Sequence, residues 1–314
     1  MRLASLGAWV TVVDTSDAGG TETVRLIEEI TQKREKDAQA QADDGHAAEA
    51  SKAGGGRTPR AIFVKCDVAR PGQLAQAFAA HVNTFKRLDV VVNNAGIANE
   101  LNFAQPQSEE APPASPDLTK LKEGGGPPLM RAEVDARPWS RMIDVNLKAV
   151  VDGVRLAVEC MGATAARSKE EEEEEEEKEE GAKRGEEEKE SRAKRVIINV
   201  ASIAGLVAHP PLPVYSATKA AVVMLSRCLG HLESELGIRV CAFCPSAMDT
   251  PLARSIAPAI IQALPDFGGY LPVETAVDGM MKLITDEGNG GSVMKVNPRE
   301  GCSYVTFDDH ILPR

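Results

Sequence analysis

Aromatic residues and long apolar runs are both scarce in this chain. Only 4% of its 314 residues are Phe, Trp or Tyr, and no segment approaches the roughly 18 uninterrupted apolar residues of a membrane-spanning helix. Residues 1–13 lack the apolar core and the cleavage site of a secretory signal. The sequence therefore predicts a cytoplasmic protein with no membrane span.

Clusters of basic residues and of metal ligands are also missing. The formal net charge is −11 and no basic stripe is present, which argues against binding to nucleic acid. His, Cys and carboxylate residues nowhere show the spacing of a metal site. The one close pair among six cysteines, Cys241 and Cys244, lies in a strand-like run, so its side chains point to opposite faces and do not form a redox dithiol. We expect buried, reduced thiols and no bound metal.

Short apolar runs alternate with helical stretches along the chain. The predicted strands are 9–13, 61–64, 90–92, 196–200, 240–243 and 292–296, and the clearest predicted helices are 73–85 and 217–236. Strands that alternate with helices imply right-handed crossovers and a parallel sheet covered on both faces. We therefore predict an α/β fold, a Rossmann-like doubly wound parallel sheet, in a single domain over residues 1–314.

Three polar segments interrupt this alternation, at about 33–60, 98–138 and 163–195. Their compositions, rich in Ala and Gly, in Pro and Gly, and in Glu, are typical of disordered surface insertions. The eight consecutive glutamates at 170–177 repel one another at i and i+4, so we expect partial helix there at best. This acidic segment could alternatively dock a basic partner.

Three residues in the second half of the chain have the spacing of a proton-transfer site. Ser202 follows the predicted strand 196–200, and Tyr215 begins a helical pattern that carries Lys219 one turn later. A strand-end serine can face a helix-borne tyrosine, and residues four apart share one face of a helix. The Lys219 ammonium is then expected to favour the ionised phenol, which in isolation titrates near about pH 10. This set predicts a tyrosine that exchanges a proton with a substrate hydroxyl.

Each residue also has an ordinary structural interpretation. Ser202 could form a turn, Tyr215 could be an amphipathic helix residue, and Lys219 a solvated surface charge. Asn146 could be a polar residue that interrupts a helix and has a buried partner. We favour the catalytic interpretation because these residues occur together, in this order, downstream of Asn-Asn-Ala-Gly at 93–96.

The combination resembles the short-chain dehydrogenase/reductase family. The matching segments are 7–15, 66–68, 87–89, 93–96, 146, 197–205, 214–219, 244–245 and 291–295. Within the family, the chain is most similar to an NAD-dependent branch that acts on hydrophobic secondary alcohols. The resemblance implies that Ser202 orients the substrate oxygen and Tyr215 exchanges its proton. It further implies that Lys219 positions the ribose and tunes the tyrosine, and that Asn146 helps to hold a proton-relay water.

The resemblance also implies NAD as the cofactor. Asp14, with Thr15, ends the predicted strand 9–13, where a carboxylate accepts hydrogen bonds from the adenosine ribose and repels the extra phosphate of NADP. Asp14 could instead cap the next helix. The other implied cofactor contacts are Cys66, Asp67 and Val68 at the adenine, Asn93, Tyr215 and Lys219 at the ribose, and Pro245, Met248 and Thr250 at the nicotinamide. Ser246 replaces the glycine that is usual in the family.

One feature of the family has no counterpart in this sequence. A Gly-rich turn between the first strand and helix normally holds the cofactor pyrophosphate, whereas the glycine runs 54–56 and 124–126 neither follow a predicted strand nor open a helix. By comparison with the family, residues 1–6 lie in the first helix, so we expect a chain truncated before Met1. Its sheet would lack the first strand, which is central in the order 3-2-1-4-5-6, and we expect weak dinucleotide binding and low stability.

The substrate is less constrained by the sequence. The related branch contacts the substrate hydroxyl with a glutamine three residues before the tyrosine, and Leu212 stands there. The apolar segment 251–272 suits a small hydrophobic alcohol or ketone. His209 could contact this substrate, although an exposed loop histidine is the more ordinary interpretation. The resemblance also implies a homo-oligomer.

An alternative hypothesis belongs to another functional class. The chain could be a non-catalytic interaction protein that keeps a dehydrogenase scaffold and binds partners through its acidic segment. The absent Gly-rich turn favours this alternative. The intact Ser, Tyr and Lys set argues against it, because a binding scaffold does not need these residues.

Overall fold

The computed structural model describes residues 1–42, 58–98, 138–176, 195–254, 264 and 268–307. The chain divides into two compact units. The first comprises Met1–Ala95, Val151–Ile197 and Leu232–Arg239, and the second comprises Gly96–Val150, Ile198–His231 and Val240–Arg314.

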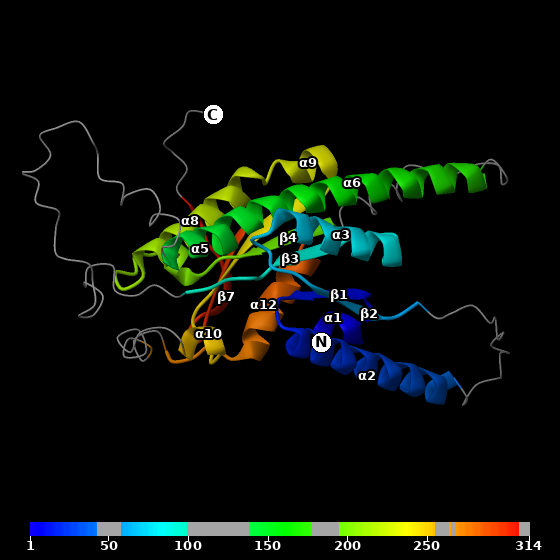
Figure 1. The fold of residues 1–314 in the computed structure, drawn as a ribbon, viewed down its shortest axis with the longest axis horizontal. Helices are drawn as coiled ribbons and strands as arrows, with labels where there is room; N and C mark the ends of the chain where they lie inside the picture. The colour runs from blue at the N-terminus through cyan, green and yellow to red at the C-terminus, as the bar shows by residue number, and fades with distance from the viewer. Residues whose placement is uncertain (43–57, 99–137, 177–194, 255–263, 265–267, 308–314) are drawn as a thin grey trace, which may run out of the picture. The chain divides into compact units, whose positions relative to one another are not determined.

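The first unit begins with a small parallel sheet covered by two helices (Figure 1). β1 (Val10–Asp14) pairs with β2 (Ala61–Lys65), and the pairing places Asp14 opposite Lys65. α1 (Arg2–Ser5) and α2 (Asp17–Ala42) pack against each other, and α2 packs on both strands. Ala4, Ile27 and Ala61 form the buried centre of this group. The apolar residues of β1, α2 and β2 therefore build one parallel crossover.

α3 (Pro71–Phe85) is fixed to β1 and the residue before it by polar and aromatic contacts. Pro71 is favoured in the first turn of a helix because its missing N–H would have no partner there. Phe85 stacks on Trp9 with ring centroids 6.4 Å apart, and His81 Nδ1 lies 2.8 Å from Thr11 Oγ1. The chain then turns at Lys86, which has a positive φ of 65°, and enters β3 (Val90–Asn93).

The larger sheet has the strand order β3-β4-β5-β6-β7. β4 (Arg195–Val200) and β5 (Ile238–Pro245) are the most buried strands, and every residue of β5 is buried. β6 (Val293–Asn297) runs parallel to β5, whereas β7 (Gly301–Tyr304) pairs antiparallel with β6. α12 (Val273–Thr285) packs on β6 and β7. The carboxyl end of β5 is thus held in the interior of the second unit.

Several helices lie near β4 and β5 in the sequence, and some of them pack together after the end of β4. α5 (Pro138–Ile143) continues into the π-helix η3 (Asp144–Lys148) and then into α6 (Ala149–Glu176). The 3₁₀ turn η4 (Ile203–Gly205) follows β4, and α8 (Pro213–Cys228) packs on η3, η4 and α5. The short helices α9 (Leu232–Leu236) and α10 (Pro251–Arg254) flank β5 in the sequence.

The α/β architecture with a largely parallel sheet is confirmed, and all six predicted strands are present within one or two residues of their predicted ends. β7 was not predicted, and its antiparallel pairing departs from the purely parallel sheet. The described strands form two separately paired sheets, β1-β2 and β3 to β7. The expected lack of a first strand stays a prediction.

The predicted helix 217–236 is wrong as a single element. α8 ends at Cys228 and α9 starts at Leu232. Gly230 lies between them, and a Cβ at this position would be 2.9 Å from the Cα of Gly291. This close approach of two backbones is a long-range contact, and it overrides the continuous helical pattern of the sequence.

Two helices extend into segments that were predicted as disordered insertions. α2 continues to Ala42 and α6 to Glu176, so the start of the acidic segment is helical. Ala, Gln, Lys and Glu have high helix propensities, which favours these extensions despite repulsion between the glutamates. The remaining parts, 43–57, 99–137 and 177–194, lie outside the described residues. The single domain with three insertions stays a prediction.

Candidate functional site

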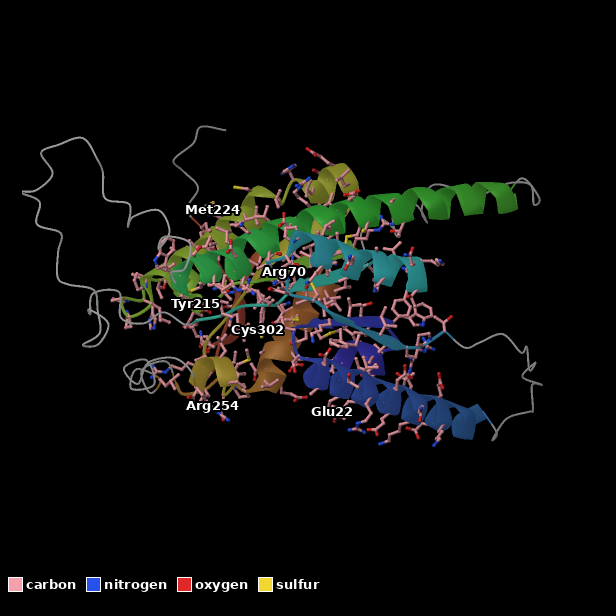
Figure 2. The ribbon with its side chains drawn as sticks, in the orientation of Figure 1. Glu22, Arg70, Tyr215, Met224, Arg254 and Cys302 are labelled. Atoms are coloured by element: carbon pink, nitrogen blue, oxygen red, sulfur yellow. The ribbon has the colours of Figure 1, made fainter. Side chains whose placement is uncertain are left out.

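The end of β4 and the start of α8 bring Ser202, Tyr215 and Lys219 together in the second unit. Figure 2 labels Tyr215 near the start of α8. The Ser202 side chain forms a hydrogen bond with the Tyr215 side chain. Lys219 Nζ lies 5.8 Å from the centroid of the Tyr215 ring and donates to the carbonyl oxygen of Val200 at 2.8 Å. A hydroxyl, a phenol and an ammonium therefore share one site.

Local structure explains how the sequence positions these groups. Ser202 is the N-cap of η4, where its Oγ accepts a hydrogen bond from the Ala204 N–H at 3.2 Å. A Cβ at Gly205 would lie 2.7 Å from the carbonyl carbon and oxygen of Lys219, so only glycine allows η4 to approach α8 this closely. Asn199 of β4 also donates to Ser226 Oγ of α8 at 3.0 Å. Strand, turn and helix are thereby held in one arrangement.

Burial controls the electrostatics of this site. Tyr215 is 9% exposed and Lys219 is 3% exposed. Burial raises the pKa of Tyr215, with an opposing effect from the Ser202 hydrogen bond and a smaller upward effect from Cys244. Burial lowers the pKa of Lys219 to about 8. The net pKa shift of Tyr215 is therefore upward, opposite to the expected lowering, because the desolvation of the ionised phenol outweighs its stabilisation by neighbouring groups.

Cys244 is a site residue that sequence reasoning missed. It is fully buried at the end of β5. Burial raises the pKa of its thiol to about 12, against the effects of a hydrogen bond with the Ser202 backbone and of the Lys219 charge. Cys241, by contrast, contacts Asn289 through its Sγ at 3.3 Å, and both thiols are free. The sequence pattern predicted that the Cys241 and Cys244 side chains point to opposite faces of the strand. It could not predict that Cys244 faces the catalytic site, because this depends on β5 lying beside β4 in the sheet.

Asn146 is fully buried in the π-helix and links two segments of the second unit. Its Oδ1 accepts from the Ile97 N–H, and its Nδ2 donates to the Ile97 carbonyl, both at 2.9 Å. Nδ2 also lies 3.3 Å from Thr218 Oγ1, which donates to the Tyr215 carbonyl at 2.7 Å. Because both N–H groups of the amide are used, a relay water would have to bind the remaining Oδ1 lone pair or a backbone carbonyl.

An apolar cluster surrounds the aromatic ring of Tyr215. It comprises the buried residues Ala98, Met142, Leu212 and Tyr215, with Ile97, Ala204 and Val214 packed against it. Leu212 is 3% exposed. The position that carries a glutamine in the related branch therefore presents only hydrocarbon here.

The residues expected at the adenosine end lie in the first unit, at the carboxyl ends of its strands. Asp14 is exposed, and its Oδ1 accepts from the Ser16 N–H at 2.8 Å, as in the capping interpretation. Cys66, next to Asp67 and Val68, donates its N–H to the Asp14 carbonyl at 2.9 Å. The backbones of the Asp14–Thr15 and Cys66–Val68 segments thus meet directly. Burial raises the pKa of the Cys66 thiol.

Asn93 ends β3, the next strand of the first unit. A Cβ on Gly153 of α6 would lie 2.4 Å from Asn93 Oδ1, so the amide packs against the helix backbone. This glycine makes room for the Asn93 side chain.

The residues expected at the nicotinamide end lie in the second unit. Pro245 closes β5. The Met248 carbonyl accepts from the Thr250 N–H at 2.8 Å, and Thr250 Oγ1 accepts from the Ala253 N–H at 3.3 Å at the start of α10. Most of the predicted lid, 255–263 and 265–267, lies outside the described residues. His209 is half-buried, and burial lowers its pKa.

Two kinds of feature are absent from the described part of the chain. No group of three or more His, Cys, Asp or Glu side chains there has a geometry that could hold a metal ion. No helix there is long and apolar enough to cross a membrane.

Known protein sequences are similar to this chain. Residues 187–260 match the family model described as "short chain dehydrogenase", and residues 36–113 match the model described as "Enoyl-(Acyl carrier protein) reductase". 15-Hydroxyprostaglandin dehydrogenase (NAD(+)) from Mus musculus is 27% identical over 79% of this chain and 75% of its own length. 3beta-Hydroxysteroid dehydrogenase 1 from Eggerthella lenta is also 27% identical, over 76% of this chain and 60% of its own length.

Solved structures share the fold. The 3-ketoacyl-(acyl-carrier-protein) reductase from Brucella melitensis complexed with NADH has a TM-score of 0.61 and 22% identity over 95% of this chain and 90% of its own. An actinorhodin polyketide ketoreductase with NADPH has a TM-score of 0.60 and 19% identity over 94% of this chain and 88% of its own. The motifs, the fold and the sequence matches together show that this chain is similar to the short-chain dehydrogenase/reductase family of oxidoreductases.

Proposed function

We propose that the protein is an NAD-dependent alcohol dehydrogenase that transfers a hydride between NAD and a hydrophobic secondary alcohol or its ketone. The hydrogen bond between Ser202 and Tyr215 beside the buried Lys219 ammonium carries this proposal. Ser202 and Tyr215 bind the substrate oxygen, and Tyr215 exchanges the hydroxyl proton. The bound dinucleotide supplies the hydride acceptor or donor.

The pKa shifts give this proton exchange a direction. A buried phenol with a raised pKa is protonated at neutral pH, so Tyr215 can donate to a ketone oxygen without a preceding deprotonation. In alcohol oxidation, Tyr215 must first lose its proton. Lys219 keeps its positive charge below about pH 8, which favours the ionised phenol in that step. Asn146 holds the Tyr215 carbonyl in place through Thr218.

The choice of NAD depends on the exposed Asp14 carboxylate at the end of β1. Its charge repels the extra phosphate of NADP. We assign Thr15, Cys66, Asp67, Val68 and Asn93 to the adenosine end, with Pro245, Met248 and Thr250 at the nicotinamide end. These strand-end positions suit a dinucleotide, but the sequence contains no Gly-rich turn for the pyrophosphate.

We propose a substrate of the 15-hydroxyprostaglandin dehydrogenase type, that is, a hydrophobic molecule with a secondary hydroxyl. The likeness to the mouse enzyme and the apolar cluster around Tyr215 support this class. Leu212 cannot form the substrate hydrogen bond of a glutamine, so the preferred alcohol differs from a prostaglandin near its hydroxyl. We further propose a cytoplasmic homo-oligomer. Met224 of α8, 52% exposed, offers an apolar contact for a second copy (Figure 2).

A second candidate function is a non-catalytic interaction protein that retains the dehydrogenase scaffold. The absence of a Gly-rich turn favours it, because weak dinucleotide binding would leave the Ser, Tyr and Lys set without a cofactor. Dinucleotide-dependent turnover separates the two candidates.

The test replaces Tyr215 by Phe and follows reduced nicotinamide by its absorbance, with millimolar NAD and a panel of aliphatic and aromatic secondary alcohols. We expect wild-type turnover and a loss of about 100-fold or more in Tyr215→Phe, because a general acid–base contributes on this order. Tyr304→Phe is the matched control. Tyr304 lies in β7, which β6 separates from β5 in the sheet, and its hydroxyl donates to Asp286. Full activity in Tyr215→Phe would disprove the proton-transfer role, and an inactive wild type would favour the interaction protein.

A further inference from the structure

Ser246 has a buried hydroxyl without a hydrogen-bond partner among the described residues. Its side chain is 5% exposed, and its Oγ shares this unpartnered state only with Ser216 Oγ in the part of the chain that the structure describes. Buried hydroxyl groups are nearly always hydrogen-bonded, because desolvation without a partner is unfavourable. An unpartnered hydroxyl at a strand end therefore points to a partner that binds there.

The backbone at Ser246 is held firmly. Its N–H donates to the Val296 carbonyl at 2.8 Å, and the Ala242 N–H donates to the Ser292 carbonyl at 2.9 Å. These two bonds belong to one parallel ladder between β5 and β6, in which alternate residues of β5 bond to the same neighbour. The ladder thus continues beyond Pro245 to Ser246. Residues 244 and 246 consequently place their side chains on the same face of the sheet.

Cys244 identifies what lies on that face. Its thiol is hydrogen-bonded with the Ser202 backbone and interacts electrostatically with Lys219 and Tyr215. The Ser246 side chain therefore lies on the same face of β5 as Cys244, the face toward Ser202, Tyr215 and Lys219. Ligands of open α/β sheets bind at the carboxyl ends of the strands, which is where Ser246 lies.

We infer that the Ser246 hydroxyl forms a hydrogen bond with the carboxamide of the bound nicotinamide. This inference deepens the proposed function and depends on it. The substrate oxygen already has two partners, Ser202 and Tyr215, whereas the carboxamide offers both an acceptor and donors at the end of the dinucleotide that Pro245, next to Ser246, is assigned to contact. A hydroxyl can either donate to its carbonyl or accept from its amide group. The glycine common in the family has no such group, so the contact belongs to this chain.

The test compares two ligands that differ only beyond the ADP-ribose moiety. Binding of NAD and of ADP-ribose, which lacks nicotinamide, is measured by ligand-observed NMR titration up to millimolar concentration. The proteins are wild type, Ser246→Ala, Ser246→Gly and the control Ser216→Ala, which removes the other unpartnered buried hydroxyl. We expect Ser246→Ala and Ser246→Gly to weaken the affinity for NAD by about threefold to tenfold, as for the loss of one hydrogen bond, and to leave the affinity for ADP-ribose unchanged. Ser216→Ala should leave the affinities for both ligands unchanged.

A thermal melt without ligand provides a second readout. Ser246→Ala should unfold at the same or a higher temperature than wild type, because it removes a buried hydroxyl without a partner. A clear fall in melting temperature would mean that the hydroxyl stabilises the free protein, and would overturn the inference.

The binding outcomes separate failure of the inference from failure of the proposed function. Unchanged NAD affinity in Ser246→Ala, or equal weakening of NAD and ADP-ribose, would overturn the inference and leave the dehydrogenase proposal intact. A wild-type protein that binds neither ligand at millimolar concentration would overturn both.

Discussion

Asn146 shows how one buried side chain connects the segments that form the site. Its amide satisfies both backbone groups of Ile97 and reaches Thr218. We expect Asn146→Ala to lower the free energy of unfolding by about 2–4 kcal/mol, because the Ile97 groups lose their partner in a buried location. Urea denaturation monitored by circular dichroism measures this loss. Thr218→Val removes fewer of these bonds and should cost about 1 kcal/mol; an Asn146→Ala loss as small as that would argue against the amide as the link.

The buried thiol of Cys244 makes stability depend on alkaline pH. Burial raises its pKa from 9.0 to about 12, so above pH 9 the folded protein retains a proton that the unfolded chain has lost. This contribution to stability is complete below pH 9 and is lost as the pH rises toward 12, by about 1.4 kcal/mol per pH unit.

The prediction concerns the difference between wild type and Cys244→Ala under reducing conditions. Between pH 9 and pH 10.5, wild type should lose about 2 kcal/mol more than the variant in urea denaturation. The difference between the two proteins should stay constant between pH 7 and pH 8. Parallel pH profiles up to pH 10.5 would mean that the thiol is not buried in the folded protein.

At this scale the sequence predicted which residues meet but not how they titrate. The spacing of Ser202, Tyr215 and Lys219 follows from strand and helix geometry, which is local. The directions of the Tyr215 and Lys219 pKa shifts follow from burial by segments far away in the sequence. The same distance in sequence concealed the contact of Cys244 with Ser202.

At the scale of elements, the contact between η4 and α8 depends on Gly205. A Cβ there would lie 2.7 Å from the Lys219 backbone, which a helix cannot relieve by rotating a side chain. We expect Gly205→Ala to lower the free energy of unfolding by about 1–3 kcal/mol through overpacking. Chemical denaturation of purified variants measures this change.

Gly162 of α6 provides the matched control. A Cβ at this position has no atom within 4 Å, so Gly162→Ala should raise stability by about 0.5–1 kcal/mol through helix propensity alone. If Gly205→Ala were as stabilising as Gly162→Ala, the close approach of η4 and α8 would be incorrect.

Elements with strong local patterns were predictable, and elements set by distant contacts were not. The apolar runs of β1 to β6 predict strands because their residues favour a buried, extended chain. The break between α8 and α9 arises where Gly230 meets Gly291, which no local pattern reports. The extensions of α2 and α6 show the reverse error, in which polar composition was taken as disorder although the residues are good helix formers.

At the scale of the whole molecule, the sequence has acceptor and hydroxyl groups for both ends of a dinucleotide but no Gly-rich turn for its centre. Backbone N–H groups of that turn normally bind the pyrophosphate. We therefore expect this chain to bind NAD with a dissociation constant above about 100 µM, which corresponds to a favourable binding free energy of less than about 5.5 kcal/mol. Isothermal titration calorimetry measures it. Nanomolar or low-micromolar binding would show that other residues replace the turn.

The most direct test of the account is whether hydride passes within the site of Ser202, Tyr215 and Lys219. A hydrophobic secondary alcohol deuterated at its carbinol carbon is incubated with excess protein and millimolar NAD, and the dinucleotide is analysed by mass spectrometry. We predict one deuterium in the reduced nicotinamide with wild type and none with Tyr215→Phe. Absence of deuterium transfer by wild type across a panel of such alcohols, at concentrations where NAD is bound, would contradict it.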